Sequence, residues 1–338
     1  MSTAKALVLF SGGLDSILAV KILQAQNIEV EAVCFTSNFF DCIKAKESAE
    51  QIGIKLNVID IGEEILSLVK NPPSGYGKNL NPCIDCHALM IRKADEFARA
   101  GGGQYDFIAT GEVLGQRPFS QNKEALLKVK NLGGAEILRP LSAKLLPETE
   151  IEKKGLVTRG RLAAIQGRTR DGQMELVKKY GVEKYPSPSG GCLLTDPEFS
   201  QRLLKLLEYW PDCTTDDAEI LKHGRVFWLN EKTSRQRILV VVGRHKEDNG
   251  YLESMAKPGD FLIKLNQLMG PTALVRGLDE NDFSHDLEIA IPEELKMSRL
   301  DLSQDKTADE ILRLAGLLTG WYAVKARGRQ VELKIEKV

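Results

Sequence analysis

Residues 6–16 read Ala-Leu-Val-Leu-Phe-Ser-Gly-Gly-Leu-Asp-Ser, and this stretch decides the fold. The continuous apolar run 6–10 predicts a buried strand, the Gly12-Gly13 pair a tight loop, and the apolar residues after Ser16 a helix. A helix that begins directly after a glycine loop presents free backbone N–H groups and the positive end of its dipole to an anion. The stretch therefore predicts a phosphate site, although Ser11, Asp15 and Ser16 also suit a loop and cap of purely structural role.

Strands and helices alternate after this stretch. We expect strands over residues 30–35, 55–60 and 105–109, and helices over 41–52 and 83–100. This alternation predicts an α/β fold with a doubly wound parallel sheet, in which ligands bind at the carboxyl ends of the strands. Thr36, at the end of the second strand, is therefore expected to face the ligand.

The composition sets outer limits. A chain of 338 residues suggests two or three domains, and 43% hydrophobic with 28% charged residues is typical of a soluble globular protein. No apolar stretch approaches the ~20 residues that span a bilayer, and the chain enters a strand rather than a signal peptide. We therefore expect a cytoplasmic protein.

The net charge of −1 does not by itself suggest a nucleic-acid partner. Residues 153–184, however, carry nine lysines and arginines against three acidic residues, a local excess of +6. Such a segment suits contacts with an RNA backbone, although a solvated charged surface would look the same.

Six cysteines are spread unevenly along the chain: Cys34, Cys42, Cys83, Cys86, Cys192 and Cys213. In a reducing compartment we expect them to be buried, catalytic or metal-bound rather than paired in structural disulfides, with Cys34 in the core. Cys83 and Cys86 form a CxxC at a helix start, where the helix dipole favours thiolates. Cys192 follows Gly190 and Gly191 in a Pro- and Gly-rich loop.

SGGLDS at residues 11–16 resembles the PP-loop of the N-type ATP pyrophosphatases, which lacks the lysine of the Walker loop. Together with NPCIDCH at 81–87, ATGE at 109–112 and GGC at 190–192, it makes residues 1 to about 195 resemble the tRNA-thiolating branch of that superfamily, the 2-thiouridylases and 4-thiouridine synthetases. The resemblance implies that ATP adenylates a base carbonyl of tRNA with release of pyrophosphate. Sulfur then displaces AMP.

The resemblance also implies roles for single residues. The nucleotide would be bound by the loop and the strand ends, that is by Ser11, Gly12, Gly13, Asp15, Ser16, Thr36, Thr110 and Gly111. Asp15 would also be catalytic and share Mg²⁺ with ATP. Cys83, Cys86 and Cys192 would deliver sulfur from a donor such as sulfide or the persulfide of a cysteine desulfurase.

Two routes of sulfur delivery are open. In one, Cys192 and one of Cys83 or Cys86 act as persulfide carrier and resolving thiol. In the other, the three cysteines hold a [4Fe–4S] cluster whose fourth iron carries the sulfide. A structural zinc site with His87 as fourth ligand is the alternative to both.

From residue 224 the pattern changes to strands. Residues 223–338 resemble the RNA-binding domain of the NFACT proteins, through Gly243–Asn249, Ala256–Asp260, Gly270–Arg276 and Ala323–Arg327. The resemblance implies an α+β domain that binds RNA through Arg244, Lys246, Arg276, Lys325 and Arg327. Trp228, Trp321 and Tyr322 are expected in its core.

Together these features predict a PP-loop domain over residues 1–145, a basic linker over 146–222 and an RNA-binding domain over 223–338. The function predicted is that of an ATP-dependent tRNA sulfurtransferase. The alternatives are a PP-loop ligase or amidotransferase that adenylates a small molecule, and a non-catalytic protein that binds RNA or the ribosome.

Overall fold

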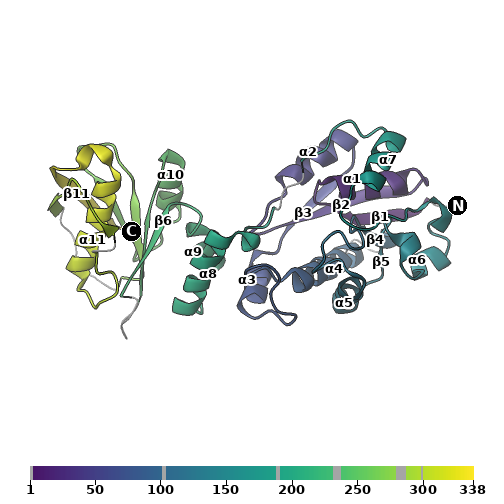
Figure 1. Cartoon of the computed structure of the whole chain (residues 1–338), viewed down its shortest axis with the longest axis horizontal. Coiled ribbons are helices and arrows are strands. Elements are labelled where there is room, and N and C mark those ends of the chain that lie inside the picture. The colour runs from purple at the N-terminus through teal and green to yellow at the C-terminus, as the bar shows by residue number, and fades with distance from the viewer. Residues whose placement is uncertain (1–2, 101–103, 188–190, 231–236, 279–286, 298–299) are drawn as a thin grey trace. The chain divides into compact units, whose positions relative to one another are not determined.

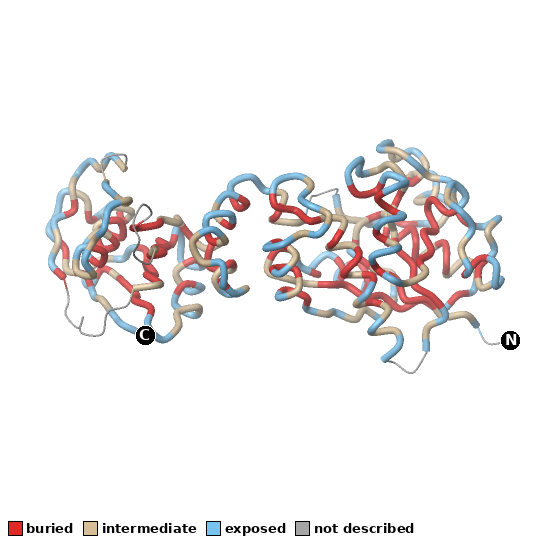
Figure 2. Tube along the Cα trace, turned by 90° about the horizontal axis from the view of Figure 1, so that it is seen from below, coloured by how far each residue is buried: buried red, intermediate tan, exposed pale blue. Residues whose placement is uncertain are grey.

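The computed structural model describes residues 3–100, 104–187, 191–230, 237–278, 287–297 and 300–338. The chain divides into two compact units, Met1–Ser200 and Gln201–Val338. Figure 2 shows that each unit has its own buried interior. The boundaries expected at residues 145 and 222 remain predictions.

The first unit is built on a five-stranded sheet in the order β3-β2-β1-β4-β5. All of its strand pairs are parallel, which confirms the α/β prediction. The strands are β1 (Lys5–Leu9), β2 (Glu29–Thr36), β3 (Leu56–Asp60), β4 (Phe107–Thr110) and β5 (Ile137–Leu138). The strand order reverses between β1 and β4, so the crevice expected for a ligand lies at the carboxyl ends of these two strands.

Helices cover both faces of this sheet (Figure 1). One face carries α1 (Leu14–Gln24), α2 (Ile43–Ile52) and α7 (Asp171–Tyr180), and the other carries α4 (Cys83–Ala100) and α5 (Lys123–Gly133). The remaining helices of the unit are α3 (Gly62–Lys70) and the short α6 (Glu150–Lys153), with 3-10 turns at Ala143–Leu145, Arg159–Arg161 and Leu193–Thr195. The sheet is therefore doubly wound, as predicted.

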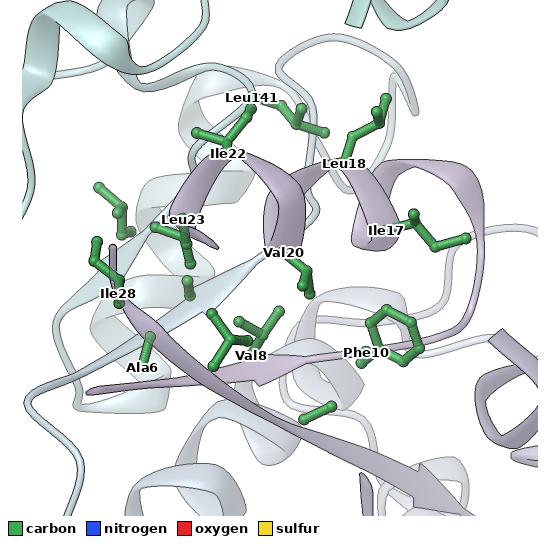
Figure 3. Packing of buried hydrophobic residues seen from close by; sticks show 14 of the residues in the cluster. Ala6, Val8, Phe10, Ile17, Leu18, Val20, Ile22, Leu23, Ile28 and Leu141 are labelled. Atoms are coloured by element: carbon green, nitrogen blue, oxygen red, sulfur yellow. The ribbon is translucent and has the colours of Figure 1, made fainter. Parts of the chain in front are cut away.

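The core forms where α1 crosses β1 (Figure 3). Val8 of β1 and Phe10, the residue after the strand, lie against Ile17 and Val20 of α1, and all four side chains are almost fully buried. On the outer side of α1, Leu141 and other apolar residues up to 182 join the same core. Helix α1 therefore carries buried apolar residues on both sides, because protein covers both of them.

The second unit holds a six-stranded antiparallel sheet in the order β10-β11-β8-β9-β7-β6. The strands are β6 (Arg225–Leu229), β7 (Ile238–Val242), β8 (Phe261–Leu265), β9 (Ala273–Arg276), β10 (Leu287–Ala290) and β11 (Gln330–Lys337). Its helices are α8 (Pro197–Tyr209, which begins just before the boundary), α9 (Thr215–Ile220), α10 (Lys246–Ser254) and α11 (Ala308–Tyr322), with a 3-10 turn at Val324–Ala326. Leu312 and Ala315 of α11 pack onto the apolar face of the sheet. A separate α+β unit is thus confirmed.

One of the arginines expected to face RNA does not do so. Arg276 is buried, with its guanidinium 2.6 Å from Asp260 and 2.8 Å from Asp217. It ties β9 to neighbouring segments of the second unit and is not available to a phosphate. Arg244 is bound by Asp248 at 2.7 Å but stays partly exposed. Trp228 is buried, as expected.

The expectation that the cysteines avoid disulfides is wrong for one pair. Cys34 is buried in the core as predicted, but it forms a disulfide with Cys42, with the two Cα atoms 6.1 Å apart. The pairing arises because the chain turns back after β2 and places Cys42, the N-cap of α2, beside the strand. Among the helices of the described ranges, none has the length and apolar character needed to cross a membrane.

Candidate nucleotide and thiol site

The loop after β1 leaves the start of α1 open. Gly13 is the N-cap residue of α1, its backbone is extended, and no side chain caps the helix. The hydroxyl of Ser16 donates to the Gly13 carbonyl at 2.8 Å, and Ser11 Oγ accepts from the Gly13 N–H at 3.4 Å. Because a helix leaves its first N–H groups without intrahelical partners, the start of α1 can bind an anion.

Gly12 is the residue that shapes this loop. Its φ of +74° is in the left-handed region, and a Cβ at this position would overlap the carbonyl of Lys44 at the start of α2. Ser48 of α2 donates to the Gly12 carbonyl at 2.9 Å. Only glycine therefore allows the loop to pack this closely against α2.

The end of β4 lies directly against the same loop. A Cβ on Gly111 would be only 2.7 Å from the backbone nitrogen of Ser16, so the two segments are in backbone contact. Thr110 and Gly111 are therefore brought to the start of α1. Thr36, the last residue of β2, instead donates from its hydroxyl to the Phe40 carbonyl, at 3.4 Å, in the loop that follows the strand.

Asp15 is held by two glutamine side chains. Gln116, in the loop after β4, donates from Nε2 to Asp15 Oδ2 at 2.9 Å, and Gln173 of α7 donates from Nε2 to Asp15 Oδ1 at 3.2 Å. Neither glutamine lies in a motif that marks it as a functional residue in the sequence. No local pattern could mark them, because these contacts join residues 101 and 158 positions apart.

A buried ion-pair network links the end of β4 to the CxxC helix. Glu112 lies 3.0 Å from His87 Nδ1 and 2.8 Å from Arg139 Nε. Burial alone would raise the pKa of Glu112, but Arg139 and His87 outweigh it and hold this pKa at about 2. Glu112 therefore fixes the first turn of α4, which carries Cys83 and Cys86, beside the end of β4. Glu112 is the last residue of the ATGE motif, but the motif alone does not reveal its partners His87 and Arg139.

Cys192 is brought to this region from far along the chain. The segment that follows it is held by Leu193, whose N–H donates to the Phe39 carbonyl at 2.9 Å, and by Asn79, whose amide donates to the Thr195 carbonyl at 2.8 Å. The thiols of Cys83, Cys86 and Cys192 interact electrostatically with one another. Gly190 of the GGC motif lies outside the described residues, as do Pro188 and Ser189.

The thiols are not activated by their surroundings, contrary to the expectation from the helix dipole. Burial raises the pKa of Cys192 to about 11; the Leu194 N–H and Arg117 oppose this rise, and Cys83 adds to it. Burial also raises the pKa of Cys83, with Arg117 opposing, and that of Cys86, where the other two thiols add to the effect. At Cys83 and Cys192, burial therefore outweighs the backbone and Arg117 contacts that favour the thiolate.

Thiols are the donors that zinc and iron–sulfur clusters prefer. Within the described ranges, however, no three or more His, Cys, Asp or Glu side chains are arranged to hold a metal ion. The three thiols are therefore of a type that binds these metals, but they are not arranged as a metal site. His87, considered as a fourth zinc ligand, is instead held by Glu112.

Comparison with known proteins finds similarity over part of the chain. Residues 4–117 match a model described as "Family of unknown function (DUF7411)". The chain is 30% identical over 159 residues to a probable tRNA sulfurtransferase of Anoxybacillus flavithermus, covering 44% of this chain and 38% of that protein. A probable tRNA sulfurtransferase of Thermoanaerobacter pseudethanolicus is 31% identical over 159 residues, covering 44% and 39%.

Among solved structures, a 4-thiouridine synthetase in complex with RNA and bound ATP matches with a TM-score of 0.34 and 20% identity, covering 53% of this chain and 52% of that one. A predicted subunit of a tRNA methyltransferase from Methanocaldococcus jannaschii matches with a TM-score of 0.30 and 23% identity, covering 40% and 69%. The chain spans less than two fifths of the length of the sulfurtransferases named above. In sequence, part of the chain is thus similar to part of proteins named probable tRNA sulfurtransferases.

Proposed function

We propose that this protein is an ATP-dependent tRNA sulfurtransferase. The proposal is carried by one observation: the open start of α1 and the three thiols are tied to the same end of one parallel sheet. Gly111 packs on the first turn of α1, and the next residue, Glu112, holds His87 of the CxxC helix. The partial similarity to probable tRNA sulfurtransferases supports this assignment.

The loop and the start of α1 serve the activation step. The backbone N–H groups of residues 12–16 and the hydroxyls of Ser11 and Ser16 bind the phosphates of ATP, with Thr110 and Gly111 beside them and Thr36 at the end of β2. Asp15 uses its remaining lone pairs to hold Mg²⁺, which neutralises phosphate charge. The carbonyl oxygen of a tRNA base attacks the α-phosphorus, and the bond to pyrophosphate breaks. The adenylated oxygen can then leave as AMP.

The thiols serve the transfer step. The Cys192 thiolate attacks the terminal sulfane sulfur of a donor persulfide, which forms a persulfide on Cys192 and releases the donor as a thiolate. The terminal sulfur then attacks the activated carbon while AMP leaves. A second thiolate attacks the Cys192 sulfur, which releases the thiolated base and leaves a disulfide that an external thiol reduces. We assign this second role to Cys83, because Arg117 stabilises the thiolates of Cys83 and Cys192.

The test of the activation step is pyrophosphate release by the full chain with ATP, Mg²⁺ and unmodified tRNA. We expect release that requires tRNA and is lost in Asp15→Ala. Asp95→Ala is the matched control, because Asp95 lies near the far end of α4, paired with Arg99. Release stimulated by a small acid or amine instead of tRNA would establish a ligase, and tRNA binding without release would establish the non-catalytic alternative.

The test of the transfer step separates the persulfide from a cluster. After anaerobic purification and exposure to a persulfide donor, mass spectrometry should show one added sulfur atom on Cys192. A brown protein with about four irons per chain would instead establish the [4Fe–4S] route. A colourless protein with stoichiometric zinc and no reactive thiol would exclude both.

A further inference from the structure

Gln173 is a polar side chain at a position that otherwise favours an apolar one. It is fully buried in α7, and its amide nitrogen donates to Asp15 Oδ1 at 3.2 Å. Its amide oxygen is also buried, and no group in the described part of the chain donates to it. An unmet buried acceptor costs roughly 1–3 kcal/mol, so stability alone does not explain a glutamine here.

The carboxylate of Asp15 is fixed from two sides. Gln116 binds one oxygen from the loop after β4, and Gln173 binds the other oxygen from α7. Two donors on different oxygens fix both the position and the plane of the carboxylate, whereas one donor leaves it free to rotate. Of the two, Gln173 is the buried one, so water cannot readily replace it.

We propose that Gln173 is the positioning residue that aims the Asp15 carboxylate at the metal of a bound Mg²⁺–ATP. This inference rests on the proposed function, in which Asp15 holds Mg²⁺ next to the phosphates. An ionised carboxylate accepts about four hydrogen bonds or metal contacts, of which the two glutamines use one on each oxygen. The remaining lone pairs are directed by the two amides. Gln173 thus lowers the stability of the fold through its unmet acceptor and, in return, fixes the orientation of the Asp15 carboxylate.

The test uses Gln173→Met, which keeps the size of the side chain and removes both amide groups. Gln121→Met is the matched control, because Gln121 is also buried, and its amide oxygen likewise lacks a donor among the described residues. Gln121 makes no side-chain bond to Asp15 among the contacts that the structure describes. Both variants remove an unmet acceptor, but only one removes a hydrogen bond to Asp15.

Calorimetry with ATP in the presence of Mg²⁺, and separately with excess chelator, measures the effect without relying on catalysis. For Gln173→Met we expect ATP affinity to fall about tenfold with Mg²⁺, as for loss of a hydrogen bond to a charged group, and less than about twofold without it. Thermal unfolding of the ligand-free variant should occur at the same or a higher temperature. Gln121→Met should match the parent in both titrations.

Each outcome decides the proposal. An equal loss of affinity with and without Mg²⁺, or a clearly lower unfolding temperature, would show that Gln173 has only a structural role. Unchanged affinity with Mg²⁺ would also overturn the proposal. If the parent binds Mg²⁺–ATP but never releases pyrophosphate with tRNA, the proposed function fails while the role of Gln173 is still measured by the titrations.

Discussion

The two ends of the parallel sheet differ in how their titratable and polar groups are placed. At the amino end, Glu31 accepts from Lys5 at 2.8 Å, from Tyr105 at 2.7 Å and from Lys55 at 3.2 Å, and the backbone N–H of Lys5 donates to Asp106 at 2.7 Å. At the carboxyl end, Gly12 has a left-handed backbone, and the buried amide oxygen of Gln173 lacks a donor in the described structure. Burial also raises the pKa of the Cys192 thiol there.

This difference indicates that the amino end of the sheet contributes mainly to stability and the carboxyl end mainly to chemistry. The carboxylate of Glu31 is paired with three donors and leaves little for a ligand, although the amino end also holds a buried amide nitrogen, that of Gln26, without a described partner. At the carboxyl end the strained glycine and the unmet amide oxygen lie at and beside the loop after β1, where function can require them. We therefore expect substitutions at the amino end to change stability more than activity. Substitutions at the carboxyl end should do the reverse.

The largest effect is expected for Cys192→Ala. Removing the sulfur carrier should reduce thiolation of tRNA at least about 1000-fold, as loss of a catalytic nucleophile does, while pyrophosphate release stays within about threefold of the parent. Mass spectrometry of the tRNA nucleosides and a pyrophosphate assay measure the two steps separately. Cys213→Ala, which removes a buried cysteine of the second unit, is the control. Retained thiolation would remove Cys192 from the mechanism.

Gly12→Ala should lower pyrophosphate release about 100-fold, because the added Cβ overlaps the Lys44 carbonyl and shifts the loop. It should also cost about 1–3 kcal/mol in free energy of unfolding, from the overlap and the left-handed backbone. Gly53→Ala is the control: Gly53 has a φ of +69° at the end of α2, but nothing lies within 4 Å of its Cβ position. Its cost should be about 1 kcal/mol, with activity unchanged. Equal loss of activity in both variants would contradict the role assigned to the loop.

Glu112 sharpens the comparison, because it is a well-paired group at the carboxyl end. Its pKa is about 2 in the folded protein and ~4.3 in an unfolded chain, so its contribution is present above pH 4.3 and lost as the pH falls toward 2. The difference corresponds to ~3 kcal/mol. Denaturation of Glu112→Gln should therefore show a deficit of about this size at pH 7 that shrinks toward zero near pH 2. A deficit independent of pH would refute the ion pairs with Arg139 and His87.

The smallest effect is expected at the amino end. Glu31→Gln should cost about 1–2 kcal/mol in free energy of unfolding, because Lys5 and Tyr105 lose a charged acceptor, with pyrophosphate release within about twofold of the parent. The control is Glu29→Gln at the more exposed partner of Lys5, which should cost less than about 0.5 kcal/mol. A large loss of activity in Glu31→Gln would contradict the claim that the amino end of the sheet affects stability and not activity.

Sequence reasoning predicted the parts that depend on local pattern. The apolar run before Gly12 and the strands and helices that follow predicted the parallel sheet and the glycine loop between β1 and α1. Thr110 and Gly111 were expected near the loop, and the backbone contact of Gly111 with Ser16 places them there. The α+β character of the second unit was also predicted, from the change to a strand pattern after residue 224 and the resemblance to the NFACT domain.

The parts that depend on tertiary contact could not be predicted. Gln173 carries no sequence signal, since only folding brings α7 onto α1. The Cys34–Cys42 disulfide depends on the turn after β2, and the burial of Arg276 depends on acidic residues from two other segments. The raised pKa of the thiols follows from their depth in the fold, which the CxxC spacing does not encode.

Helix α7 has a consequence for how the two ligands of a sulfurtransferase would influence each other. Gln173 points inward to Asp15, while Lys178 and Lys179 on the same helix are exposed, about 8 Å further along at 1.5 Å per residue. A polyanion that binds these lysines and restricts the motion of α7 would, through Gln173, also restrict the motion of the Asp15 carboxylate. Linkage then requires reciprocity: whatever factor RNA adds to the affinity for Mg²⁺–ATP, Mg²⁺–ATP must add to the affinity for RNA.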